Sequence, residues 1–161
     1  YKDLNLLGGG VNILEQYEIN FDTLAIIPIN TRVSKVIEKN NTYIVNKKSI
    51  DIIEDSCRFF GCTLEGRHEG TKELIGITYK SPIIIEESRD IIFFPTSSPR
   101  YNNCYWIALN KIKKSEQLNN FSQIIFINDY ELELNISYES LQNQILRATM
   151  LESTLRKRRN S

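Results

Sequence analysis

The fold is decided at residues 49–61, which read SIDIIEDSCRFFG, because the spacing of apolar residues changes there. Apolar residues recur at helical steps, at Ile50, Ile53, Cys57 and Phe60. Ser49 can cap a helix by accepting a backbone N–H, and Asp51 suits the positive end of the helix dipole. Gly61 can end the helix in a left-handed conformation. We therefore predict a helix over roughly residues 49–60.

The sequence before this helix is typical of β-strands. Residues 17–29 are rich in Tyr, Ile, Phe and Leu, with Asn20 and Asp22 as breaks, and they predict two short strands joined by a turn. Two β-branched runs follow at residues 33–38 and 42–45. The Lys-Asn-Asn segment between these runs favours a hairpin.

The sequence after the helix predicts a loop and then further strands. Residues 61–71 contain Gly61, Gly66 and Gly70 among charged side chains, which is typical of a flexible polar loop. Alternating or β-branched runs predict strands at 73–78, 83–85, 91–94, 105–109, 124–127 and 130–134. The last two flank Asn128-Asp129, a strong two-residue hairpin signal.

The chain returns to helical spacing after Ser137. One apolar face is formed by Leu141, Ile145, Ala148, Leu151 and Leu155. Four basic residues at 156–159 suit a helix C-terminus, so we expect a long helix over about 138–159. The fold class is α+β, a mostly antiparallel β-sheet with one internal helix and a long C-terminal helix. We expect residues 12–161 to form a single domain and residues 1–11, with three consecutive glycines, to be a mobile arm or a foreign tail.

The composition is that of a globular protein with separated charges. Of the 161 residues, 41% are hydrophobic and 25% are charged, and the formal net charge is zero, which excludes a uniformly basic nucleic-acid binder. Counted by segment, residues 80–114 carry a net charge of +3, residues 115–150 carry −4 and residues 151–161 carry +3. Such clustering leaves room for a phosphate-facing patch.

The cysteines and the apolar runs indicate a cytoplasmic protein. Three cysteines, an odd number, fit reduced thiols. No run approaches the roughly 20 apolar residues of a membrane helix, and no secretory signal is visible. Four side chains could in principle bind zinc: Cys57, Cys62, His68 and Cys104. They lack the short paired spacing of structural zinc sites, so ordinary thiols and a surface histidine are favoured, with no metal or other cofactor.

The sequence contains little that indicates catalysis. Cys62 could be an exposed nucleophile, but His68 is the only histidine and no base-and-orienter pair lies nearby. A redox sensor would need a thiol of depressed pKa. Because phosphate-loop and dinucleotide motifs are also lacking, we expect a protein that is not an enzyme.

Basic residues near the helix at 49–60 suggest a different chemistry. Arg58 precedes two phenylalanines, and Arg67, His68 and Lys72 follow in the glycine-rich segment. These donors could converge on phosphate oxygens, and arginine is drawn into narrow A·T-rich minor grooves. The alternative is a solvated arginine beside two core rings. The basic cluster at 156–159 could likewise bind phosphates or continue into a longer tail, but a frayed, solvated helix end is favoured.

The hexapeptide SCRFFG at 56–61, followed by Gly66-Arg67 and Gly70-Thr71, resembles the signature of the ComK family of competence transcription factors. Further segments agree in order and spacing: Tyr17-Glu18-Ile19-Asn20, Val36-Ile37-Glu38-Lys39, Lys80-Ser81-Pro82-Ile83, Phe93-Phe94-Pro95-Thr96-Ser97, Trp106-Ile107, Ile136-Ser137-Tyr138 and Asn143-Gln144. The resemblance runs from about residue 17 to residue 150.

The resemblance implies an activator of DNA-uptake genes that binds double-stranded DNA at paired A·T-rich boxes from the minor-groove side, as a dimer or larger assembly and without a cofactor. Its location would be the cytoplasm, at the nucleoid. We expect DNA contacts from Arg58, Arg67, His68, Lys72, Lys80 and Arg100. An alternative is a protein-interaction module that keeps the fold and regulates through partners. Longer members continue past the C-terminal helix into a segment captured by an adaptor–protease system, so the resemblance implies such a system as a further candidate partner. The sequence stops at Ser161, naturally or by trimming, and leaves capture through that segment open.

Overall fold

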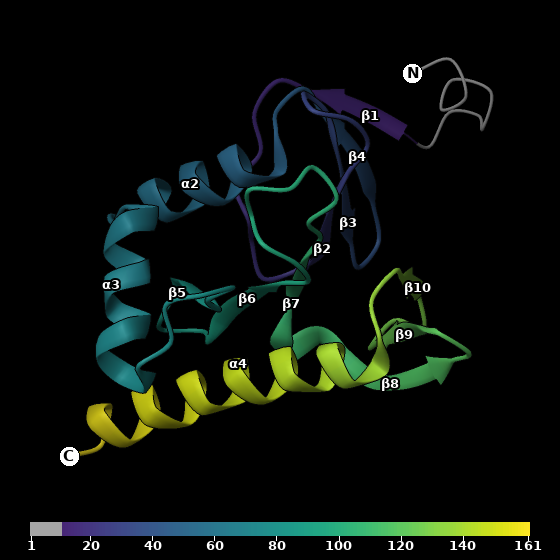
Figure 1. The fold of residues 1–161 in the computed structure, drawn as a ribbon. Helices are drawn as coiled ribbons and strands as arrows, with labels where there is room; N and C mark the ends of the chain where they lie inside the picture. Colours follow the sequence, from purple (N-terminus) through teal and green to yellow (C-terminus); the bar gives the residue numbers. More distant parts are fainter. Residues whose placement is uncertain (1–10) are drawn as a thin grey trace.

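The computed structural model describes residues 11–161 (Figure 1). Its helices are α2 (Ser49–Phe59), α3 (Leu64–Ile75) and α4 (Tyr138–Arg159), with a short 3-10 helix η1 (Leu109–Lys111). Its strands are β1 (Val11–Leu14), β2 (Thr23–Pro28), β3 (Ser34–Glu38), β4 (Thr42–Val45), β5 (Ile83–Glu86), β6 (Ile91–Pro95), β7 (Trp106–Ala108), β8 (Ile112–Leu118), β9 (Phe121–Phe126) and β10 (Glu131–Leu134). The α+β class, the mostly antiparallel sheets and the long C-terminal helix are confirmed. The expectation for residues 1–11 lies outside the described residues, except for Val11 in β1.

The strands form two sheets. A seven-stranded sheet has the order β1-β4-β3-β2-β7-β6-β5, and a three-stranded sheet has the order β10-β9-β8. All neighbours are antiparallel except β1 and β4, which run parallel. The predicted hairpins at 39–41 and at Asn128-Asp129 are both present, and Asp129 takes the positive φ that a tight turn needs.

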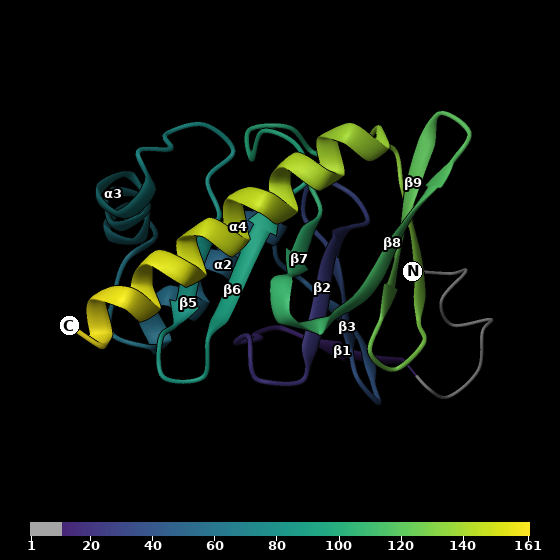
Figure 2. The same cartoon turned by 90° about the horizontal axis from the view of Figure 1, so that it is seen from below.

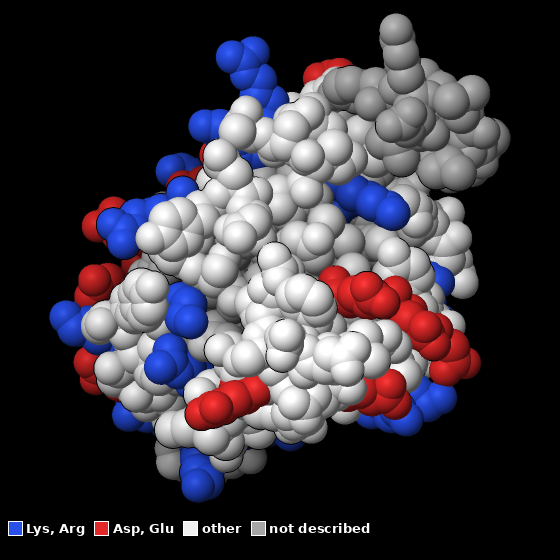
Figure 3. All heavy atoms as spheres, turned by 45° about the vertical axis from the view of Figure 1, so that its right-hand side comes forward, with Lys and Arg blue, Asp and Glu red and all other residues white. Residues whose placement is uncertain are grey.

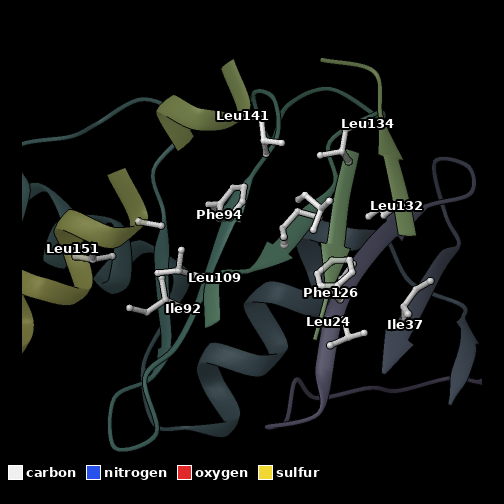
Figure 4. Packing of buried hydrophobic residues seen from close by; sticks show 14 of the residues in the cluster. Leu24, Ile37, Ile92, Phe94, Leu109, Phe126, Leu132, Leu134, Leu141 and Leu151 are labelled. Carbon is white, nitrogen blue, oxygen red and sulfur yellow. The ribbon is translucent and has the colours of Figure 1, made fainter. Parts of the chain in front are cut away.

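The large sheet is covered on both faces (Figures 1 and 2). On one face, Ile26, Val36 and Trp106 pack with α2 in a first buried cluster. On the other face, α4 and the small sheet cover a second cluster, which includes the predicted apolar face of α4 (Figure 4). Because successive strand residues point to opposite faces, neighbouring Phe93 and Phe94 of β6 enter different clusters.

The start of α2 differs from the prediction in one detail. Lys48 is the N-cap and offers no side-chain bond, whereas Ser49 is the first helical residue. The Ser49 hydroxyl lies 2.9 Å from that of Ser34 at the start of β3, so it fastens the helix to the sheet instead of capping it. Gly61 has a φ of 87°, the left-handed conformation expected at this helix end.

The predicted loop at 61–71 and the strand at 73–78 were wrong, because residues 64–75 form a second internal helix, α3. Thr63 caps it by accepting the N–H of Gly66, and Gly76 ends it in a left-handed conformation. The buried Thr71 hydroxyl lies 2.7 Å from the carbonyl of Pro82, which joins α3 to the entry of β5. Such tertiary contacts offset the cost of glycine in a helix.

The corrected helix leads to a prediction at Gly70. A Cβ added there would meet no atom within 4 Å, so Gly70→Ala should raise the free energy of unfolding by about 0.5–1 kcal/mol. Urea unfolding would measure this gain. In Gly66→Ala the new Cβ would lie 3.1 Å from both Cys62 Sγ and Thr63 Oγ1, so its gain should be smaller or reversed. Equal gains from the two variants would contradict the packing of this helix.

Other parts of the fold were not anticipated either, among them strand β1 at the edge of the large sheet. Residues 17–22 are not a strand; they lead into β2 through a turn in which the buried Tyr17 hydroxyl lies 2.6 Å from Thr23 and 2.5 Å from Glu38. Strand β8 is formed by the charged segment 112–118, in which no residue is buried and Lys113, Lys114 and Gln117 are exposed.

Candidate nucleic-acid interface

The core of the SCRFFG segment is structural. The buried Ser56 hydroxyl accepts the N–H of Ile19 at 2.9 Å and donates to the carbonyl of Ile52 at 2.7 Å, so it joins α2 to the chain entering β2. Cys57 lies in the first cluster, and burial raises the pKa of its thiol to about 12. A thiol with such a pKa stays protonated at neutral pH and is a poor nucleophile.

The end of the same segment faces solvent. Arg58 projects from α2, and its guanidinium forms an i,i+4 ion pair with Glu54 at 2.8 Å. Beside it, the Phe59 ring is 64% exposed. Arg58 is thus paired with an acidic neighbour in this structure and is not a free guanidinium. An exposed pair of this kind contributes less than about 1 kcal/mol, so the guanidinium can exchange Glu54 for a phosphate at little cost.

Arg67 does not lie on a flexible loop. It belongs to α3, and its side chain is only 17% exposed. One terminal nitrogen lies 3.3 Å from Glu87, whereas Nε is buried without a hydrogen-bond partner among residues 11–161. Its charge also acts on Cys57, where it opposes the effect of burial on the thiol pKa. The helical backbone of α3 therefore sets the direction of the Arg67 side chain.

His68 and Lys72 lie one helical turn apart on α3 and face the segment 77–82. Together with Glu69, they line a shallow hollow with Thr78 and Ser81. Burial lowers the pKa of His68, so this imidazole is neutral at neutral pH. Lys72 is exposed and supplies the positive charge on this side of the hollow.

The segment opposite is held in place by α4. Lys80 has a φ of 49°, its Nζ lies 5.6 Å from the centre of the Tyr79 ring, and its carbonyl accepts a bond from Gln144. Arg147 donates to the carbonyl of Tyr79 at 3.0 Å. We call His68, Lys72, Tyr79, Lys80 and Arg147 the α3 surface. It combines three permanent cations with an exposed aromatic ring.

Sequence reasoning missed Tyr79 and Arg147. A signal for Arg147 was present, because it is the only basic residue between 115 and 150 and stands on the predicted long helix. Tyr79 directly precedes a predicted site residue. What the sequence does not reveal is that α4 crosses this segment and brings Arg147 to it.

Arg100 does not belong to the α3 surface. It is exposed in the loop between β6 and β7. The neighbouring Pro99, Tyr101 and Asn102 line a hollow together with Thr31 and Lys48, at the start of α2. Three of the six predicted residues, His68, Lys72 and Lys80, are thus brought together, whereas Arg58, Arg67 and Arg100 have separate surroundings.

The charged side chains are distributed unevenly on the surface. On the face in Figure 3, acidic side chains form a row on the right, whereas acidic and basic side chains are mingled along the left edge. Among residues 11–161, no three Cys, His, Asp or Glu side chains gather as a metal site would require. The same residues include no helix that is long and apolar enough to span a membrane.

The chain is similar to known proteins over most of its length. The family model described as "ComK protein" matches residues 14–160. The chain belongs to the ComK family. Over 150 residues it is 38% identical to the protein named "Competence transcription factor" of Bacillus subtilis (strain 168), an alignment that covers 90% of this chain and 78% of that protein. No solved structure gives a significant match.

The match to the ComK family model extends beyond the SCRFFG segment. It includes α3, the segment 77–82 and the whole of α4, so every element of the α3 surface lies inside it. The resemblance seen in the sequence is confirmed at the level of the family.

Proposed function

We propose that this protein is a DNA-binding transcription activator of competence genes. The observation that carries the proposal is membership of the ComK family, together with 38% identity to a competence transcription factor over 90% of the chain. A regulator of transcription works on the chromosome, so we place the protein in the bacterial cytoplasm, at the nucleoid. Its role is binding and not catalysis.

The α3 surface is the part of the molecule that we propose to face DNA. Lys72, Lys80 and Arg147 can neutralise phosphates, and Tyr79 offers a flat apolar face beside them. Arg58, Arg67 and Arg100 are proposed as further contacts. Arg58 is more available than Arg67, because its side chain is 62% exposed and that of Arg67 only 17%.

We further propose that recognition concerns paired A·T-rich boxes read from the minor groove. The minor groove distinguishes A·T from G·C but hardly distinguishes A·T from T·A. Replacing box A·T pairs by G·C should therefore cost about 1–3 kcal/mol of binding free energy per pair, whereas A·T-to-T·A exchanges should cost less. Gel-shift titration would compare them. Equal losses would indicate major-groove readout.

The same titration tests the alternative, a module that regulates through partner proteins. Phosphate neutralisation makes log Kd depend linearly on log salt concentration, and protein docking does not. A wild-type protein without salt-dependent DNA binding would overturn the proposed function.

Light scattering on a two-box fragment should give two or more chains per fragment. Because the apolar face of α4 is used in the core, subunit contacts must come from other surfaces.

A further inference from the structure

A second group of cations lies at one end of the seven-stranded sheet. Four connections meet at this end: the turn before β2, the β3–β4 turn, the β5–β6 turn and η1 after β7. Figure 2 shows the three turns along its lower edge. They carry Phe21, Lys39, Arg89 and Lys111, residues 18 to 90 positions apart in sequence. Only the antiparallel order of the strands brings these residues to one edge.

Phe21 is the centre of the group. Its ring is 46% exposed, although it is large and apolar. Lys111 Nζ lies 3.5 Å from the ring centroid and Arg89 Cζ lies 5.3 Å from it. Both distances are within the range of cation–π attraction, which is worth about 0.5–1 kcal/mol at exposed sites. The ring therefore holds two cations close together.

Lys39 joins this pair from the next turn. Its backbone N–H donates to the carbonyl of Asp22 at 2.9 Å, which fixes the β3–β4 turn beside Phe21. Burial lowers the pKa of Lys111, and the charges of Lys39 and Arg89 lower it further, against the effect of Asp22. Lys111 thus lies close to two other cations, Lys39 and Arg89, and to the Asp22 carboxylate.

The nearest carboxylate on the β5–β6 turn is already engaged. Asp90 forms ion pairs with Arg156 at 3.1 Å and Arg159 at 3.0 Å, both from the end of α4. Within residues 11–161, Lys39, Arg89 and Lys111 form no ion pair within 4.0 Å. Three cations are therefore held near one another without a direct ion pair, although the Asp22 carboxylate also acts on Lys111. An incoming anion would relieve the repulsion that remains between them.

We propose that Lys39, Arg89 and Lys111, arranged around Phe21, bind backbone phosphates of DNA. This Phe21 cluster is a contact surface additional to the α3 surface, and the proposal rests on the proposed function. A polyanion fits better than a small anion, because the cations stand on three separate connections and do not converge on one enclosed pocket. Their preorganisation by the ring reduces the entropy lost on binding.

The test compares two double variants of the full chain. Lys39→Gln/Lys111→Gln removes two charges from the cluster, and the control Lys113→Gln/Lys114→Gln removes two charges from β8, where both lysines form ion pairs instead. Fluorescence anisotropy with A·T-box DNA and with unrelated DNA would give Kd at several salt concentrations. Each lost phosphate contact lowers the slope of log Kd against log salt by about 0.9.

For the cluster variant, the slope of log Kd against log salt should therefore be smaller by nearly two. This variant should also bind both DNAs about 10- to 50-fold more weakly at 0.15 M salt. The control should keep the wild-type slope. Lys39→Arg/Lys111→Arg should keep it as well, which separates charge from folding. If wild-type protein binds DNA and the cluster variant matches the control, the cluster proposal is overturned and the proposed function stands. If wild-type protein does not bind, the proposed function itself fails.

Discussion

The Leu151→Ala variant is expected to lose about 2–5 kcal/mol of unfolding free energy, the range for removing a large aliphatic side chain from a packed core. Leu151 is completely buried on α4. Figure 4 shows its side chain pointing to the large sheet, next to Ile92 and Leu109. Truncation would leave a cavity between helix and sheet that neither rigid element can close.

Urea unfolding followed by circular dichroism would measure this loss. The matched control is Leu146→Ala, on the same helix, because Leu146 is 58% exposed and its truncation should change stability by no more than about 0.5 kcal/mol. Equal losses at the two positions would show that the outer face of α4 is also packed in solution, as a subunit contact would require.

The second large effect is expected at Gln144, a buried polar side chain in the middle of the same helix. Its Nε2 donates to the carbonyl of Pro95 at 2.7 Å and to that of Lys80 at 2.9 Å. Gln144→Leu keeps the volume approximately and removes both donors. A buried carbonyl left without a donor costs about 1–3 kcal/mol, as at Pro95, and the part-buried carbonyl of Lys80 should cost less, so a total loss of roughly 2–4 kcal/mol is expected.

Gln144 also positions the α3 surface, so its loss should affect binding separately from stability. At a temperature where the variant is folded, affinity for box DNA should fall because Lys80 is no longer held by α4. Asn143→Leu, at an exposed neighbouring position, is the control for adding an apolar side chain to the helix. Unchanged stability in Gln144→Leu would mean that water or another donor satisfies the two carbonyls.

Much of the fold is predictable from local patterns. The bounds of α4 follow from its apolar spacing and from the capping Ser137, and the β9–β10 hairpin follows from Asn128-Asp129. These features depend on neighbours in sequence. Helix α3 was missed because Gly66 and Gly70 weaken its local signal, and what stabilises it is contact with distant segments, such as the bond from Thr71 to Pro82.

Part of the candidate site is likewise predictable from the sequence, and part is not. That Arg58 projects outward is predictable from the spacing of its helix. The direction of Arg67 is not, because it depends on the rotation of a helix that was taken for a loop. The Phe21 cluster was missed altogether, since its cations are scattered along the chain and meet only when the order of the strands is known.

The pairing of β2 with β7 has a consequence for synthesis on the ribosome. Ala25 pairs with Ile107 and Ile26 with Trp106, so one edge of β2 stays open until about 80 further residues have been translated. During that interval β2, β3 and β4 form a nascent hairpin sheet with an unprotected apolar edge, the kind of edge that recruits foreign strands. The edge is closed when Trp106 has been synthesised and β7 pairs with β2. The time needed to translate from β2 to β7 therefore sets how long the nascent chain needs chaperones or a low concentration to avoid aggregation.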